Sequence, residues 1–255
     1  MSLGNAINAA AQVAGEEMSN NAPCLCVHAF LYSNGKMQNI ESKTLFPGGS
    51  IAYGINKSAH VVGQGFISSA NFHAFLYSGG RMIDLNPFNG YQPIARSIND
   101  SGEVVGSSTG GAATWLYANG KLTNLSATNS GYFINNGGEI VGQNSSGHGA
   151  LYSNGSWSDL GGFAGASATI ALGINASGQV IGTAFFPVQS YHPFRPGKHV
   201  ALLFTSSGPV DLDTLIPPNS GFTLTDATAI NDNGQIAADA TNSGGAKRAV
   251  LLTPK

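Results

Sequence analysis

Short apolar runs alternate with polar, turn-forming residues along the whole chain, and the same order of runs and turns keeps returning. The clearest copy is Ser97–Leu125, in which four apolar runs are separated by a four-residue turn ending in Gly102, a looser link, and the turn Asn119-Gly120. Glycine at the end of such a turn can adopt the left-handed conformation, and Asn-Gly between apolar runs is a strong hairpin signal. The pattern predicts a four-stranded antiparallel meander, whose strands we name a, b, c and d.

Six copies of this pattern follow one another. The Ile-Asn pair that opens the a–b turn recurs with its asparagines at Asn8, Asn56, Asn99, Asn135, Asn175 and Asn231, at intervals of 48, 43, 36, 40 and 56 residues. We expect each asparagine oxygen to accept a backbone N–H two residues on. Ala11 and Ala59 replace the turn glycine in the first two copies. Six repeats of about 40 residues and four strands have the period of a β-propeller blade.

The sequence therefore predicts an all-β fold, a six-bladed β-propeller of four-stranded antiparallel meanders in a single domain, residues 1–255. The expected blades span residues 1–45, 46–90, 91–126, 127–164, 165–220 and 221–255. Strand c supports this fold, because runs such as HAFLY are apolar on both faces and suit a sheet packed between two neighbours. The alternative is a β-solenoid, which would show a more constant period.

The sixth copy ends before a strand d, which raises the question of how the last blade is completed. We expect a three-stranded sixth blade whose strand c is an unpaired edge, or an edge-to-edge contact between molecules of an otherwise monomeric protein. Met1-Ser2-Leu3 is typical of an engineered start. Restoring about ten upstream residues should then supply the missing strand and raise the melting temperature.

Composition agrees with an all-β protein and excludes some partners. Charged residues make up 9% of the chain, hydrophobic residues 42%, and glycine 35 of 255 positions. A net charge of −2 gives no basic field for binding nucleic acid. No apolar run approaches the roughly 18 residues of a membrane-spanning helix, so we expect no membrane insertion.

The repeats also carry a family resemblance. HAFLY at His28–Tyr32 and His73–Tyr77, each after an Ile-Asn turn, resembles the HAF repeat of bacterial extracellular repeat proteins, although copies three, five and six lack its His and Phe. The tail Asp211–Pro254 resembles the segment that precedes a PEP-type C-terminal sorting signal in such proteins. The resemblance implies export and an extracellular or cell-surface location, without implying a known reaction.

The links between strands b and c vary among the copies, whereas the a–b and c–d turns are short and uniform. Variable links at one side of a rigid scaffold are typical of a binding face, but insertions in surface loops also cost little, and both interpretations remain open. The longest link, Thr183–His199, combines aromatic rings with hydrogen-bond donors, which suits a sugar ring or an acidic group. The candidate ligand-binding residues in it are Phe185, Phe186, Tyr191, His192, Phe194, Arg195 and Lys198. The alternative, which we favour, is that these aromatic side chains fold back as a cap.

Three histidines, His28, His73 and His148, occupy equivalent positions in different copies. The blades between them would hold them apart, so they do not predict a zinc site, and we expect no metal and no other cofactor. A polar residue also recurs before the last apolar residue of strand d, which predicts a structural hydrogen bond rather than a catalytic pair. These residues are Asp84, Asp159 and Asp211, with Asn39 and Asn124. Cys24 and Cys26 are the only cysteines, and whether they are free or bridged stays open.

Two classes of function remain. The first is a non-enzymatic extracellular binding or scaffold module that presents its variable loops to a glycan or a surface protein. The alternative is a propeller glycan hydrolase or lyase acting at the central channel, where Arg96 and Asp226 lie on or beside the innermost strands. A hydrolase needs two carboxyl groups roughly 5–10 Å apart, and these strands hold no run of acidic residues, so we favour the first class.

Overall fold

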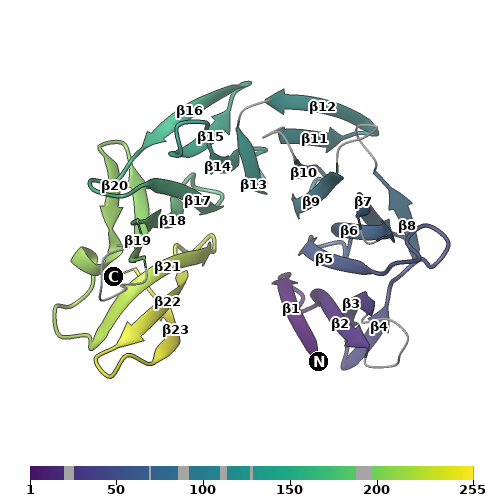
Figure 1. Ribbon diagram of the computed structural model, residues 1–255, viewed down its shortest axis with the longest axis horizontal. Helices are drawn as coiled ribbons and strands as arrows, with labels where there is room; N and C mark the ends of the chain where they lie inside the picture. The colour runs from purple at the N-terminus through teal and green to yellow at the C-terminus, as the bar shows by residue number, and fades with distance from the viewer. Residues whose placement is uncertain are drawn as a thin grey trace. The chain divides into compact units, whose positions relative to one another are not determined.

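The computed structural model describes residues 1–19, 26–68, 70–85, 92–109, 114–126, 129–187 and 197–254, and in them it contains six small antiparallel sheets that follow one another along the chain (Figure 1). Five sheets have four strands and the sixth has three, each in simple sequence order. The prediction of six meanders with a three-stranded last blade is confirmed. No helix in the described residues is long and apolar enough to cross a membrane.

The chain forms two compact units, Met1–Thr128 and Asn129–Lys255, of three sheets each. The strands of the first unit are β1 Ser2–Ile7, β2 Val13–Ser19, β3 Cys26–Ser33, β4 Lys36–Asn39, β5 Ser50–Ile55, β6 Val61–Ser68, β7 Asn71–Ser78, β8 Arg81–Asp84, β9 Gln92–Ile98, β10 Val104–Thr109, β11 Thr114–Ala118 and β12 Lys121–Ser126. We call the sheets β1–β4, β5–β8 and β9–β12 blades one to three. The single-domain organisation stays a prediction.

The second unit holds blades four to six. Its strands are β13 Ser130–Ile134, β14 Ile140–Gln143, β15 Gly149–Ser153, β16 Ser156–Gly161, β17 Ala168–Ile174, β18 Val180–Phe185, β19 His199–Thr205, β20 Gly208–Asp211, β21 Phe222–Ile230, β22 Ile236–Asn242 and β23 Lys247–Leu252. A short 3₁₀ helix, η1, spans Leu212–Leu215 after β20 and was not expected from the sequence. Asp211 caps it by accepting a hydrogen bond from the Asp213 backbone N–H at 2.9 Å.

The turn chemistry explains why the repeats fold as they do. Asn34, Asn119 and Asn154 in the c–d hairpins have φ of 52°, 52° and 53°, followed by glycines that also have positive φ, as a two-residue hairpin with both central residues left-handed requires. In the a–b turns Ala11 and Ala59 adopt φ of 57° and 58°, where the later copies have glycine. The first two copies therefore carry alanine at a turn position whose left-handed backbone conformation is strained for a residue other than glycine.

The a–b turn asparagines do more than the sequence indicated. Each accepts backbone N–H groups from two and four residues on, as Asn56 does from Ser58 and His60 at 3.0 Å each. The side-chain amide also donates to the equivalent asparagine carbonyl of the following blade in both units. These bonds run from Asn8 to Asn56 (2.9 Å), Asn56 to Asn99 (3.0 Å), Asn135 to Asn175 (3.0 Å) and Asn175 to Asn231 (3.1 Å). One residue type thus closes its own turn and ties neighbouring blades together.

The core of each unit lies between neighbouring sheets. In the first unit one buried cluster joins blades one and two around Phe46 and Phe75, and another joins blades two and three around Trp115. In the second unit Leu202 and Phe204 centre the cluster of blades four and five, and Leu224 with Leu212 that of blades five and six. Sheets buried on both faces agree with the apolar strand c runs of the sequence.

The b–c links are shorter than expected in several blades. In blade two β6 and β7 continue until only residues 69 and 70 separate them, and the rings of Phe66 and Phe72 pack edge to face at 6.1 Å across the extension. In blade four the link closes as a second asparagine turn, with Asn144 accepting from the backbone of Ser146 and His148 at 3.0 Å each. The sequence overestimated these links because apolar pairs and asparagine turns extend the hairpins.

Candidate functional site

The long link of blade five, which carries the predicted ligand-binding residues, is described at its two ends. Tyr191, His192, Phe194 and Arg195 lie outside the described residues, whereas Phe185, Phe186 and Lys198 lie within them. Phe185 ends β18 and pairs with His199 at the start of β19. The described part of the predicted site is therefore the base of the link.

The rings at this base are packed against the protein. Phe185 meets the His199 ring edge to face at 4.6 Å, and His199 Nδ1 lies 3.1 Å from Asp226 Oδ1 of the next blade. Phe186 meets Phe163 edge to face at 6.2 Å, and both rings pack against the core of blades four and five. The side chains of Phe185 and Phe186 thus fold back onto the protein, and the cap expected of the whole link stays a prediction.

The same base keeps features that suit a ligand. Phe163, Phe186 and Phe185 are only half-buried, and the exposed Lys198 places Nζ 5.7 Å from the centre of the Phe186 ring. The Phe186 backbone N–H donates to the Lys198 carbonyl at 2.9 Å, which fixes the two residues against each other. An apolar ring surface with an adjacent ammonium group can hold a sugar ring that carries an acidic substituent.

The recurring histidines and acidic residues form separate pairs, one each in blades one, two and four. His73 Nδ1 lies 2.8 Å from Asp84 Oδ2, and His148 Nδ1 lies 3.0 Å from Asp159 Oδ2, while His28 pairs with Glu41. Each pair joins the start of strand c to the end of strand d of its own blade. The expected structural hydrogen bond of Asp84 and Asp159 is confirmed, and its histidine partner is the part that the sequence did not give.

Asp159 shows how such a pair holds the end of strand d. Its partial burial raises the pKa of the carboxyl. The hydrogen bonds from the Gly161 backbone N–H, His148 and Asn144 lower the pKa by more than burial raises it, so the pKa lies below its ordinary value. The carboxylate is thus the form favoured by the fold.

Among the described residues no three His, Cys, Asp or Glu side chains come together as metal ligands.

The two cysteines lie at the border of the described residues. Cys24 lies outside the described residues, and of Cys26 only the backbone, in β3, belongs to them. Their state stays open, as the sequence left it.

The first strands of the blades carry bulges, and these aim polar side chains together in the first unit. The register of β5 slips at Tyr53 and that of β9 at Arg96. Tyr53 donates its hydroxyl to Gln64 Oε1 at 3.2 Å, and Arg96 Nε donates to Ser107 Oγ at 3.4 Å. The pKa of Tyr53 lies above its ordinary value. Burial is the main cause, and the charge of Glu16 adds to it, while the charge of Arg96 acts in the opposite direction. Arg96, expected on an innermost strand, thus belongs to a polar cluster. Asp226 is held by His199 instead.

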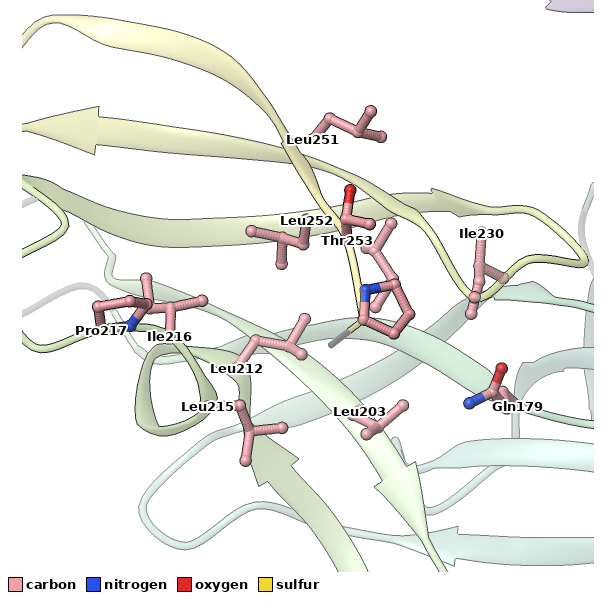
Figure 2. Close-up of a pocket in the computed structure, with 13 residues that line it drawn as sticks. Gln179, Leu203, Leu212, Leu215, Ile216, Pro217, Ile230, Leu251, Leu252 and Thr253 are labelled. Carbon is pink, nitrogen blue, oxygen red and sulfur yellow. The ribbon is translucent and has the colours of Figure 1, made fainter.

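A groove of about 520 Å³ lies in the second unit beside β23 and is apolar (Figure 2). Leu203, Leu212, Leu215, Ile216, Pro217 and Leu252 are among the residues that line it, and Figure 2 shows their side chains gathered around the opening. Sequence reasoning missed it, although the missing strand d of copy six was the signal that pointed there.

Comparison with known proteins supports the fold and leaves the function open. No family model and no curated protein sequence matches the chain. The chain is similar to the structure of a prolyl endopeptidase with a TM-score of 0.60 and 10% identity, over 96% of this chain and 41% of that one. It therefore spans well under half the length of that enzyme. Aleuria aurantia lectin in complex with Fucalpha1-6GlcNAc matches with a TM-score of 0.45 and 14% identity, over 96% of this chain and 90% of the lectin.

The sheet order and the first of these similarities define the class of protein. The chain is a six-bladed β-propeller of small antiparallel sheets, with a three-stranded sixth blade. The solenoid alternative is set aside.

Proposed function

We propose that this propeller is a non-enzymatic binding or scaffold module, and that its ligand, a glycan or a surface protein, binds at the long link of blade five. The observation that carries the proposal is the base of that link, where the half-buried rings of Phe163 and Phe186 lie beside the exposed Lys198. This base is rigid because the Phe186 and Lys198 backbones are hydrogen bonded at 2.9 Å. A rigid base under a long, aromatic loop is the usual construction of a binding site on a repeat scaffold.

The placement of the acidic side chains supports binding rather than hydrolysis. A hydrolase needs two carboxyl groups facing one substrate, roughly 5–10 Å apart. Here Asp84, Asp159 and Asp226 each contact a histidine. Asp100 and Asp232 accept backbone N–H groups of a neighbouring blade at 2.9 and 2.8 Å. These carboxylates hold strand ends and blade junctions.

An extracellular or cell-surface location is part of the same proposal. It rests on the resemblance of the HAFLY repeats, His28–Tyr32 and His73–Tyr77, to the HAF repeat of exported bacterial proteins. Expression of the complete gene in its native host, followed by fractionation, tests this part.

The binding site is tested with an array of neutral and acidic oligosaccharides. We expect acidic oligosaccharides to bind best, and we expect Lys198→Ala or replacement of residues 188–196 by a Gly-Ser linker to weaken the binding. Loss of one ammonium contact should lower affinity about two- to tenfold. Lys121→Ala, an exposed lysine of β12 in the other unit, is the matched control. An affinity that survives the linker replacement in a protein with an unchanged melting temperature contradicts the proposed site.

A further inference from the structure

The third strand of blade six is an edge within the part of the chain that the structure describes. β23 pairs with β22 alone, whereas strand c of the other five blades also pairs with a strand d. The registers align the copies: Val250 opposite Ala238 corresponds to Phe75 opposite Gly63, and Leu252 corresponds to Tyr77. An unpaired edge presents backbone N–H and C=O groups to another strand.

The groove of Figure 2 lies where strand d places an apolar side chain in other blades. In blade two Met82, opposite Tyr77, packs on the cluster of the preceding blade that contains Ile40. In blade three Leu122, opposite Tyr117, does the same on the cluster that contains Leu85. The corresponding residues in the second unit are Leu252 on β23 and Leu212 after β20, and both line the groove. The groove therefore lies at the position that an apolar side chain of strand d fills in blades two and three.

The charge at the start of β23 gives a second, independent requirement. Arg248 stands at the position of His28, His73 and His148, each of which meets a carboxylate from the end of its own blade. Arg248 donates to the Lys247 carbonyl at 2.8 Å and forms no ion pair in the described residues. A strand that fits β23 as β8 fits β7 would carry its carboxylate opposite Val250, within reach of Arg248.

We propose that the edge of β23 and the adjoining groove bind an extended segment of a partner protein, which adds antiparallel to the sheet as a fourth strand. The segment carries Met or Leu opposite Leu252, Asp or Glu two residues later opposite Val250, and then Leu or Ile. Backbone hydrogen bonds supply affinity, while the groove and Arg248 supply register and selectivity. This surface is separate from the long link of blade five, so the two proposals succeed or fail independently.

The chain supplies its own test peptides. A fluorescein-labelled peptide with the sequence of residues 80–85, GRMIDL, carries the required pattern, and residues 120–125, GKLTNL, replace the carboxylate by an amide. Fluorescence polarisation with the full chain should show saturable binding of the first peptide and weaker binding of the second. Met82→Ser in the peptide should lower affinity about tenfold or more, because a buried methionine side chain is lost.

A charge exchange tests the register. Asp84→Arg in the peptide should weaken binding to the unchanged protein about two- to fivefold or more, and Arg248→Asp in the protein should restore it. Arg81→Ala in the peptide is the control and should leave affinity unchanged, because Arg81 pairs at the end of the strand and its side chain points to the opposite face from Met82 and Asp84. Saturable binding that follows Met82 and the exchanged charges supports the proposal.

Three results overturn it. The first is absence of binding at millimolar peptide. The second is a concentration-dependent dimer in sedimentation that Arg248→Asp dissociates and the peptide does not, which assigns the edge to a second copy. The third is a longer form of this protein, carrying its natural flanking residues, that no longer binds the peptide, which assigns the edge to the chain itself.

Discussion

Removing the side chain of Asn56 should destabilise the first unit far more than the same change at Asn231. Both asparagines close the same turn: Asn56 accepts from Ser58 and His60, and Asn231 accepts from Asn233 and Gln235 at 3.1 and 2.9 Å. The Asn56 amide donates to the Asn99 carbonyl of the next blade at 3.0 Å, whereas the Asn231 amide donates to Gln235 Oε1 of its own turn at 2.9 Å. Asn56 is 4% exposed, whereas Asn231 is exposed to solvent. The pair thus separates the bond between blades from the bonds within the turn.

Each of the two asparagine side chains makes three hydrogen bonds, so the difference in magnitude follows from burial and from the bond between blades. Each hydrogen bond contributes about 1 kcal/mol net, and a buried group left without its partner costs about 1–3 kcal/mol. Asn56→Ala removes three bonds at a buried site, so we expect a loss of about 3 kcal/mol. Asn231→Ala exposes its turn groups to water, so we expect about 1 kcal/mol. Asn56→Asp keeps the acceptor oxygen and places a carboxylate against the Asn99 carbonyl, which should cost about 2 kcal/mol.

Urea unfolding followed by tryptophan fluorescence measures these losses, because Trp115 and Trp157 report on separate units. For a protein of this size 3 kcal/mol corresponds to a melting temperature lower by about 6–12 °C. The Asn56 variants should lower the transition that Trp115 reports. Equal losses for Asn56→Ala and Asn231→Ala would refute the reasoning, because the bond between blades would then contribute nothing.

Further predictions concern the repeat positions. Ala11→Gly should stabilise the protein by about 0.5–1 kcal/mol, because Ala11 is exposed and has a φ of 57°, and Gly102→Ala should cost about 1 kcal/mol at the equivalent turn, both measured by thermal unfolding. Gly63→Ala should prevent stable folding, since a Cβ there would lie 1.9 Å from the Ile51 carbonyl oxygen, whereas a Cβ at Gly102 meets nothing within 4 Å; soluble expression of both variants gives the comparison. Asp159 has a pKa lowered by folding, so its contribution to stability is full above the unfolded pKa of about 3.9 and is lost as pH falls through the folded pKa. The melting temperatures of the unchanged protein and of Asp159→Asn should therefore approach each other as pH falls from about 4 through the folded pKa, and a constant difference contradicts the Asp159 assignment.

The sequence predicted the sheets well because the determinants of a meander are local. Asn-Gly hairpins and asparagine turns fix each strand pair within about ten residues, and the observed registers follow from them. The missing strand of blade six was visible for the same reason. What the sequence did not give depends on neighbours far along the chain. The bond from Asn56 to Asn99 spans 43 residues, and the partner of His199 lies in the next blade.

The candidate site was predicted by composition and position only, and this explains what was missed. A long aromatic link marks a place where a ligand can bind, but whether Phe186 points outward or onto Phe163 depends on the packing of two blades. The groove beside β23 is harder to predict from the sequence, because it lies where blade six lacks the fourth strand that the other five blades have.

That fivefold presence makes the groove more informative than an ordinary apolar surface. In a repeat protein each interface has been formed several times from the same kinds of residues, so the missing partner of one copy can be inferred from the partners of the others. In blade two Met82 lies opposite Tyr77, which predicts an apolar partner for Leu252. His73 pairs with Asp84, which predicts an acidic partner for Arg248. The histidine–acid pairs and the edge of β23 therefore involve the same position of strand c in different blades. In blades one, two and four a carboxylate at the end of strand d pairs with the histidine of strand c, and in blade six Arg248 occupies the histidine position without an ion pair in the described residues.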